Sequence, residues 1–282
     1  MKLLDDEITA DFDSVLTTAI RISQGTAGIP TSRVTEMASQ LLMQNVITSL
    51  TIDALVHPPP RLGISELPQS FTVTDLPSLC ILTRGIVETY LTLFYIAVES
   101  VPAAEREFRL LWWDWHEVNE RICALNWIGS KTKNLEPYGK KRNALRSRIA
   151  KHTNYSSLPK KLKNQFEQQK LPTDAVLLSK AQIAEIAGVH PVQFRVVYKS
   201  LSQYAHAQPI AISTMLGSSA SSPEVKSHFN YAVRHAISYL LFSVRDFITV
   251  FPEGRELTDE KFWRLVAIWG EGHNADLGKT LL

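Results

Sequence analysis

The feature that most constrains the fold is an apolar run from Leu76 to Val98 that contains an arginine and a glutamate. Arg84 and Glu88 are four residues apart, so a helix places them on one face, about 40° from each other. Their neighbours are almost all apolar, which predicts a helix that is buried on most sides. Removing one partner of a buried ion pair leaves the other charge uncompensated and lowers the stability of the fold by about 3–5 kcal/mol. The run therefore predicts a core helix that carries either a structural ion pair or part of a functional site.

A second polar stripe lies on the expected helix 192–207. Tyr198, Ser202 and His206 follow i, i+4, i+8 spacing, and Arg195 joins them within an arc of about 80°. An imidazole such as that of His206 can act as a general acid or base near neutral pH. Tyr198 and Ser202 can donate hydrogen bonds, and Ser202 is a candidate nucleophile if a base reaches it. If the two stripes face each other, the five residues Arg84, Glu88, Tyr198, Ser202 and His206 form a site.

Helical periodicity recurs along the whole chain, and no convincing strand pattern appears. The predicted fold class is therefore all-α, a helical bundle with an inserted basic segment. Three regions are expected: N-terminal helices over 1–74 that pack on the bundle, the bundle itself over 75–251, and a short helix and tail over 252–282. Helices are predicted over 5–23, 31–56, 75–98, 103–128, 175–187, 192–207, 224–251 and 260–269.

The basic segment, residues 131–170, has twelve Lys and Arg and two Glu, in a chain whose formal charge is only +2. Its composition predicts short helices joined by loops. Such a segment either binds RNA, DNA or an acidic partner or is a solvated, mobile insertion. Tyr138, Tyr155 and Phe166 are available for base stacking. The candidate nucleic-acid-binding residues are Lys140, Lys141, Arg142, Arg146, Arg148, Lys160 and Lys161.

Other patterns indicate a cytoplasmic protein without a cofactor. The first residues are acidic where a signal peptide needs apolar ones. The apolar runs 76–98 and 235–251 are both interrupted by charges, so no membrane association is expected. Cys80 and Cys123 lack metal-ligand spacing and fit reduced thiols. The sequence has neither a histidine–cysteine metal motif nor a glycine-rich phosphate loop, so we expect no metal and no cofactor.

The segments Leu82–Glu88 and Tyr198–His206 resemble those of uncharacterised bacterial helical proteins in which an R-x-x-x-E helix packs near a Y-x-x-L-S-x-x-x-H helix. That group is similar to the HEPN superfamily. The resemblance implies a compact and often dimeric bundle, and a role as an RNA-cutting toxin or defence effector or as a partner-binding protein. The R-x(4–6)-H pattern of HEPN ribonucleases occurs at Arg109–His116 and Arg146–His152, about as often as chance predicts. His206 with Arg84 and Glu88 is therefore the better candidate for a metal-independent ribonuclease site.

Two other functions stay open. Residues 181–198 are similar to a helix-turn-helix, which would direct His190, Gln193, Arg195 and Lys199 into a DNA major groove. The protein can also be a scaffold in which both polar stripes are structural.

Overall fold

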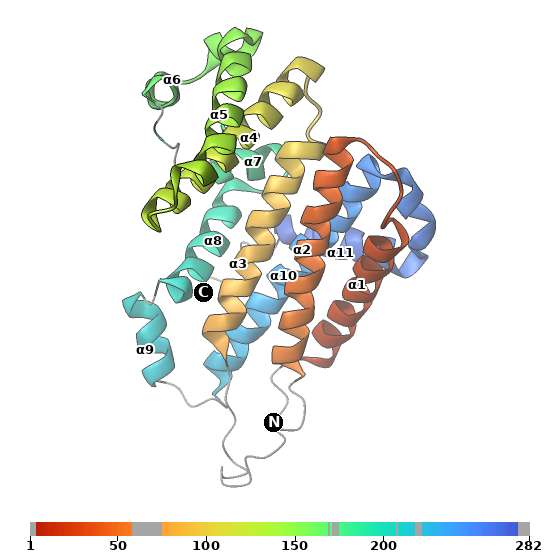
Figure 1. Cartoon of the computed structure of the whole chain (residues 1–282). Helices are drawn as coiled ribbons and strands as arrows, with labels where there is room; N and C mark the ends of the chain where they lie inside the picture. The colour runs from red at the N-terminus through yellow and green to blue at the C-terminus, as the bar shows by residue number, and fades with distance from the viewer. Residues whose placement is uncertain are drawn as a thin grey trace. The chain divides into compact units, whose positions relative to one another are not determined.

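The computed structural model describes residues 4–57, 75–168, 170, 175–206, 208–217 and 222–275, and within these ranges every regular element is a helix (Figure 1). The predicted all-α fold class is confirmed. By contacts, the chain divides into two compact units, residues 1–98 with 180–282 (unit 1) and residues 99–179 (unit 2). The elements of unit 1 are α1 (Asp6–Gly25), α2 (Arg33–Val56), α3 (Leu76–Leu93), η1 (Phe94–Val98), α7 (Lys180–Ile186), α8 (Pro191–Ala205), α9 (Pro209–Gly217), α10 (Pro223–Val250), η3 (Pro252–Leu257) and α11 (Glu260–Ala275).

In unit 1, α3 is the central helix, because it packs against α2, α8 and α10 (Figure 1). Its buried face includes Leu79, Ile86, Val87 and Tyr90. Helices α2 and α3 begin where the sequence predicts them. Ser32 caps α2 by accepting a hydrogen bond from the Thr35 amide at 3.2 Å, and Asp75 caps α3 by accepting one from the Ser78 amide at 3.0 Å.

The run Leu76–Val98 is the single helix in the described ranges that is long and apolar enough to cross a membrane. The core helix of a globular protein passes the same test of length and composition. In this protein 61% of the tested window is buried inside the structure. The apolar composition of α3 thus corresponds to its packing against three neighbouring helices.

Unit 2 contains α4 (Ala103–Trp127), α5 (Thr132–Lys151), η2 (Thr153–Ser157) and α6 (Lys160–Glu167). Its core is a cluster around Trp112, Trp115 and Phe166. The prediction of only short helices in the basic segment is wrong for α5, which is a continuous helix of 20 residues. Leu145 and Ile149 bury one face of α5 in that core, and this packing outweighs its weak intrinsic helix signal.

The structure also differs from the prediction in the start of α7, in the presence of α9 and in the division of the chain. The predicted helix 175–187 begins only at Lys180, because residues 175–178 form bends. The sequence does not predict helix α9, since residues 209–217 have no polar and apolar alternation at helical spacing. The predicted regions 1–74, 75–251 and 252–282 are bounded by helix breaks, whereas the compact units divide the chain after residues 98 and 179.

Candidate functional site

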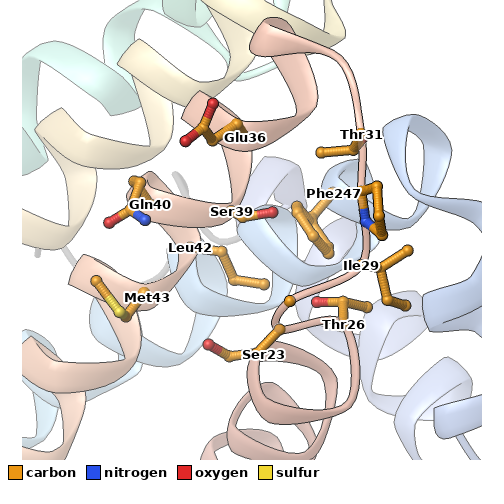
Figure 2. A pocket seen from close by; sticks show the side chains of 13 residues that line it. Ser23, Thr26, Ile29, Thr31, Glu36, Ser39, Gln40, Leu42, Met43 and Phe247 are labelled. Carbon is orange, nitrogen blue, oxygen red and sulfur yellow. The ribbon is translucent and has the colours of Figure 1, made fainter.

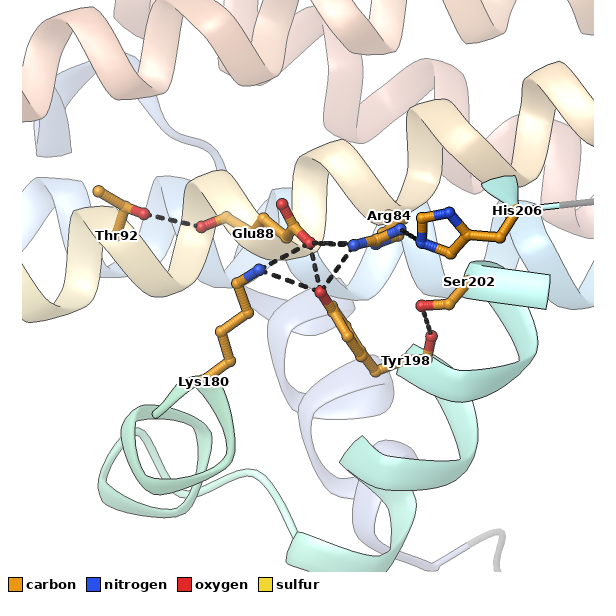
Figure 3. Close-up of polar contacts among 7 residues, drawn as sticks. All are labelled: Arg84, Glu88, Thr92, Lys180, Tyr198, Ser202 and His206. Atoms are coloured by element: carbon orange, nitrogen blue, oxygen red, sulfur yellow. Dashed lines mark hydrogen bonds and ion pairs between the residues drawn. The ribbon is translucent and has the colours of Figure 1, made fainter. Parts of the chain in front are cut away.

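A polar cluster joins three helices of unit 1 (Figure 3). Arg84 and Glu88 come from α3, Tyr198 comes from α8, His206 caps the C-terminus of α8, and Lys180 is the first residue of α7. Helix α8 buries Phe194, Val197 and Leu201 in the core, which leaves the next face of the helix at the edge of the core. Residues that are distant in sequence therefore meet where solvent can reach them.

Glu88 holds the centre of this cluster. Its Oε1 accepts hydrogen bonds from the Tyr198 hydroxyl at 2.5 Å, from Lys180 Nζ at 3.0 Å and from Arg84 Nε at 3.0 Å. The side chain of Glu88 keeps 33% of its surface exposed. One carboxylate oxygen thus receives three donors, two of them cationic, which are the stronger kind of hydrogen bond.

The Tyr198 hydroxyl also accepts hydrogen bonds from both cations. Arg84 Nη2 and Lys180 Nζ each lie 3.0 Å from this oxygen. The two charged groups also lie over the Tyr198 ring, at 5.0 Å and 5.4 Å from its centroid, within the range of cation–π attraction. Tyr198 therefore fixes both cations with its oxygen and its ring.

The remaining edge of the Arg84 guanidinium meets His206, with Nη1 at 3.2 Å from Nε2. A guanidinium can only donate, so Nε2 accepts and the imidazole is neutral with its proton on Nδ1. Nδ1 has no hydrogen-bond partner among the described residues. His206 is thus held at one nitrogen and open at the other.

The cluster has two permanent cations and one carboxylate, a net charge of +1. Burial alone would raise the pKa of Glu88, but the hydrogen bonds and charges of Tyr198, Lys180 and Arg84 outweigh burial and lower it. Burial alone would lower the pKa of Lys180, but its bonds to Tyr198 and Glu88 raise it. These three charges therefore persist at neutral pH.

A hollow of about 460 Å³ opens beside His206. It lies between the end of α8 and the start of α9, and it is lined by Lys199, Ser202, Gln203, His206, Gln208, Pro209 and Ile210. His206 thus belongs both to the polar cluster and to the wall of this hollow. A ligand in the hollow would contact the imidazole of His206, whose Nε2 is hydrogen-bonded to Arg84.

All five residues of the cluster fall within residues 77–223, just over half of the chain, which match the model of a family of unknown function (DUF5677). The chain belongs to the DUF5677 family. Comparison with curated proteins found no match, and comparison with solved structures found none. The DUF5677 match extends from the start of α3 to the start of α10, so it includes the elements that form the cluster and the hollow.

Two residues of the predicted polar stripe have other roles in this DUF5677 protein. The Ser202 hydroxyl donates to the backbone oxygen of Tyr198 at 2.5 Å, which is a local bond within α8. No base approaches Ser202 among the described contacts, so the structure gives no support for a nucleophile there. Arg195 is exposed and makes no bond in the cluster. Sequence reasoning missed Lys180, because nothing in a predicted helix over 175–187 distinguished this lysine from a surface residue.

Two residues of the alternative motifs, Gln193 and Arg109, are buried. Gln193, which the helix-turn-helix prediction directed into a DNA groove, is only 8% exposed. That prediction is wrong for Gln193, because the residue faces the core side of α8. Arg109, from the R-x(4–6)-H pattern, is also buried and is bound by Glu99 Oε2 at 2.6 Å and by Glu105 Oε1 at 2.5 Å. Arg109 is therefore part of an ion-pair network at the start of α4.

The predicted nucleic-acid-binding residues all lie in unit 2. Three of them pair with acids: Lys140 with Glu136, Lys141 with Glu117, and Arg148 with Glu107. Arg146 donates to the Glu167 backbone oxygen, Arg142 is half-buried, and Lys160 and Lys161 are exposed. The prediction of stacking aromatic residues is wrong for Phe166, which is buried in the core, and Tyr138 and Tyr155 pack against the same core.

Two other places in unit 1 have features of ligand sites. Asp13, Asp53 and His57 have oxygen and nitrogen atoms within 4.8 Å of one another, but Asp13 and His57 are exposed and His57 Nδ1 is paired with Asp53 at 2.9 Å. A pocket of about 440 Å³ lies between the α1–α2 connection, α2 and α10 (Figure 2). Its floor includes Leu42 and Phe247, and Glu36 is its one charged lining residue. Neither place combines a charged network with a hollow as the His206 site does.

Proposed function

We propose that this DUF5677 protein is a HEPN-like helical effector of bacterial type that acts on RNA, as a toxin or in a defence or stress response. The observation that supports this most is the contact of Arg84 with His206 at 3.2 Å beside an open hollow. Phosphodiester chemistry needs a fixed positive charge and a group that transfers protons. Arg84 and His206 are these two groups.

The proposed reaction is attack of the RNA 2′-hydroxyl on the adjacent phosphorus. The P–O bond to the 5′-oxygen breaks, a 2′,3′-cyclic phosphate forms, and one proton moves from the 2′-hydroxyl to the leaving oxygen. A phosphate oxygen bound at Arg84 Nη1 would displace His206 and free Nε2 to accept the 2′-hydroxyl proton. Glu88 and Tyr198 keep the guanidinium in place by accepting hydrogen bonds from its Nε and Nη2. Lys180 in turn holds Glu88 by a hydrogen bond to Oε1. The transfer uses protein groups alone, so we expect it to be independent of metal.

The products of the reaction test this proposal. Purified protein is incubated with single-stranded RNA in the presence of a chelator, beside the same RNA with one 2′-deoxy substitution at each mapped cleavage position. The expected result is cleavage with 2′,3′-cyclic phosphate ends, which the substitution blocks at that position. Cleavage that continues past a 2′-deoxy residue, or that leaves 3′-hydroxyl ends, would overturn the proposed chemistry.

We further propose a homodimer, as the HEPN resemblance implies, that works in the cytoplasm without entering a membrane, as the acidic first residues and the charges within the apolar runs predict. Sedimentation equilibrium checks the first part. A mass of about twice the monomer's 31.7 kDa is expected, whereas a monomer at all concentrations would contradict it. Recovery of the protein in the soluble fraction of lysed cells checks the second.

A second candidate function is nucleic-acid binding without catalysis, through the basic residues of unit 2. It is favoured by the excess of ten basic charges over 131–170 and by the exposure of Lys160 and Lys161. Neutralising Lys140, Lys141 and Arg142 together should weaken binding and reduce its salt dependence. The exposed His190, which precedes α8, and the exposed Arg195 and Lys199 within α8 offer another surface for DNA. A purely structural cluster instead predicts that His206→Ala lowers stability and changes no binding.

A further inference from the structure

Trp127, at the last turn of α4 in unit 2, is 85% exposed, and the neighbouring Ile128 is 77% exposed. Trp112 and Trp115 of the same helix are fully buried. A large aromatic side chain gains free energy on leaving water, so Trp127 and Ile128 together form an exposed apolar patch that is suited to contact with another molecule. Trp127 does not pack in the hydrophobic core of unit 2.

The turn after Trp127 is rigid. The Gly129 amide donates to the Asn126 oxygen at 3.0 Å and the Ser130 amide donates to the Leu125 oxygen at 2.9 Å, the two bonds of a Schellman motif. Gly129 adopts a φ of 64°, which a side chain would strain. The indole is thus presented from an ordered helix end, and little conformational entropy would be lost when it binds a ligand.

The charge around this turn is positive. Lys131 and Lys133 follow within six residues of Trp127, both are exposed, and neither has an ion-pair partner among the residues that the structure describes. Besides Lys133, six Lys and Arg lie along α5, a helix of 20 residues that is about 30 Å long, and three of these six, Lys140, Lys141 and Arg148, pair with acids. Cations spaced along about 30 Å of helix fit a polyanion better than a single small anion.

We propose that Trp127 stacks on an unpaired base of a single-stranded nucleic acid whose phosphates contact Lys131, Lys133 and the basic residues of α5. Stacking needs an exposed aromatic face, and the phosphates need cations spaced along the strand. An anionic membrane would contact Trp127 and Ile128, but it would not need the basic residues along the length of α5. The inference rests on the proposed contact of unit 2 with phosphates, and it uses none of the residues proposed for cleavage.

The test is binding of the full chain to fluorescent oligothymidylate, which lacks the 2′-hydroxyl and cannot undergo the proposed cleavage. Trp127→Ala should weaken binding by about 5- to 150-fold, the range expected for one stacked base. Trp127→Phe should retain most of the affinity, and Trp127→Leu, which is apolar but has no aromatic face, should lose it. Unchanged thermal unfolding of the three variants would show that they fold.

Inorganic polyphosphate is the matched probe without bases. Wild type and Trp127→Ala should bind polyphosphate equally, while Lys131→Gln with Lys133→Gln should weaken the binding of both probes. Equal affinity of Trp127→Ala and wild type for oligothymidylate would overturn the proposal, even if neutralised lysines weaken binding. Binding of wild type to anionic lipid vesicles and not to oligothymidylate would also overturn it. If neutralising Lys140, Lys141 and Arg142 changes the binding of neither probe, the second candidate function, nucleic-acid binding through the basic residues of unit 2, fails. The contact of Trp127 is judged separately, by Trp127→Ala.

Discussion

Glu88 Oε1 and the hydroxyl oxygen of Tyr198 lie 2.5 Å apart, although 110 positions separate the two residues in the sequence. Lys180 Nζ lies 3.0 Å from each of these oxygens, so a single ammonium group joins α7 to α3 and α8. The same two oxygens accept hydrogen bonds from the Arg84 guanidinium. The position of Arg84 therefore depends on groups from three helices.

Replacing Lys180 tests how much this junction stabilises unit 1. Lys180→Met removes two hydrogen bonds and one charge at a side chain that is 40% exposed, so we expect a loss of about 1 kcal/mol of unfolding free energy. Lys226→Met is the matched control, since Lys226 is 41% exposed and has one ion pair, with Asp5. Its expected loss is below about 0.5 kcal/mol. Equal losses in urea denaturation would contradict the role given to Lys180.

The pKa of Glu88 makes the stability of the cluster depend on pH. It is lower in the folded protein than the ordinary value of 4.5, so the carboxylate stabilises the fold above pH 4.5 and this stabilisation is lost as the pH falls through the folded-state pKa. The difference in stability between wild type and Glu88→Gln should therefore shrink from about pH 6 to about pH 3. Denaturation midpoints across this range measure it. A difference that stays constant or grows on acidification would show that the charge of Glu88 is not stabilising.

Ser202 should be dispensable for any reaction at the site. Ser202 lines the hollow, but its hydroxyl donates to the Tyr198 backbone oxygen within α8, so Ser202→Ala removes no nucleophile that a base has activated. We expect RNA cleavage at the wild-type rate and a stability within about 0.5 kcal/mol of wild type. A loss of cleavage in a folded Ser202→Ala protein would restore the serine as a nucleophile.

Two glycines of unit 2 should respond in opposite directions to the same substitution. Gly129→Ala places a Cβ at a φ of 64° and should cost about 1–2 kcal/mol. Gly139 lies inside α5, has no positive φ and has open space where the Cβ of an alanine would lie, so Gly139→Ala should add about 0.5–1 kcal/mol. Thermal unfolding of the two variants separates these effects. A stabilising Gly129→Ala would contradict the rigid turn on which the Trp127 proposal depends.

The shared face of Arg84 and Glu88, and that of Tyr198 and His206, could be predicted because local spacing carries the information. Polar residues at four-residue intervals on two otherwise apolar helices must share a narrow face, and a buried face must meet another element. The helix starts at Ser32 and Asp75 are equally local, since one side chain accepts from an amide three residues later. Such features require no knowledge of tertiary contacts.

The errors arise where tertiary packing decides. The sequence offers Phe166 as a free stacking residue, yet its ring centroid lies 4.9 Å from that of Trp115 in the core of unit 2. The sequence predicts a helix over 103–128, but it does not show that Trp127, at the end of that helix, lies in solvent. Lys180 could not be assigned to the site, because its partners belong to helices that the sequence places far away. The side of a helix that meets the core was predictable, and the neighbour that it meets there was not.

The most direct test of the proposed site is the effect of His206→Ala on RNA cleavage, measured with folded protein and a chelator present. His206 is exposed at the end of α8, so its replacement should leave the fold intact. We predict that cleavage by wild type falls by at least about 100-fold in His206→Ala, the lower end of what a proton-transfer group contributes. Cleavage that persists at the wild-type rate in the variant, or its absence from wild type, would contradict the central claim that Arg84 and His206 form a reactive pair.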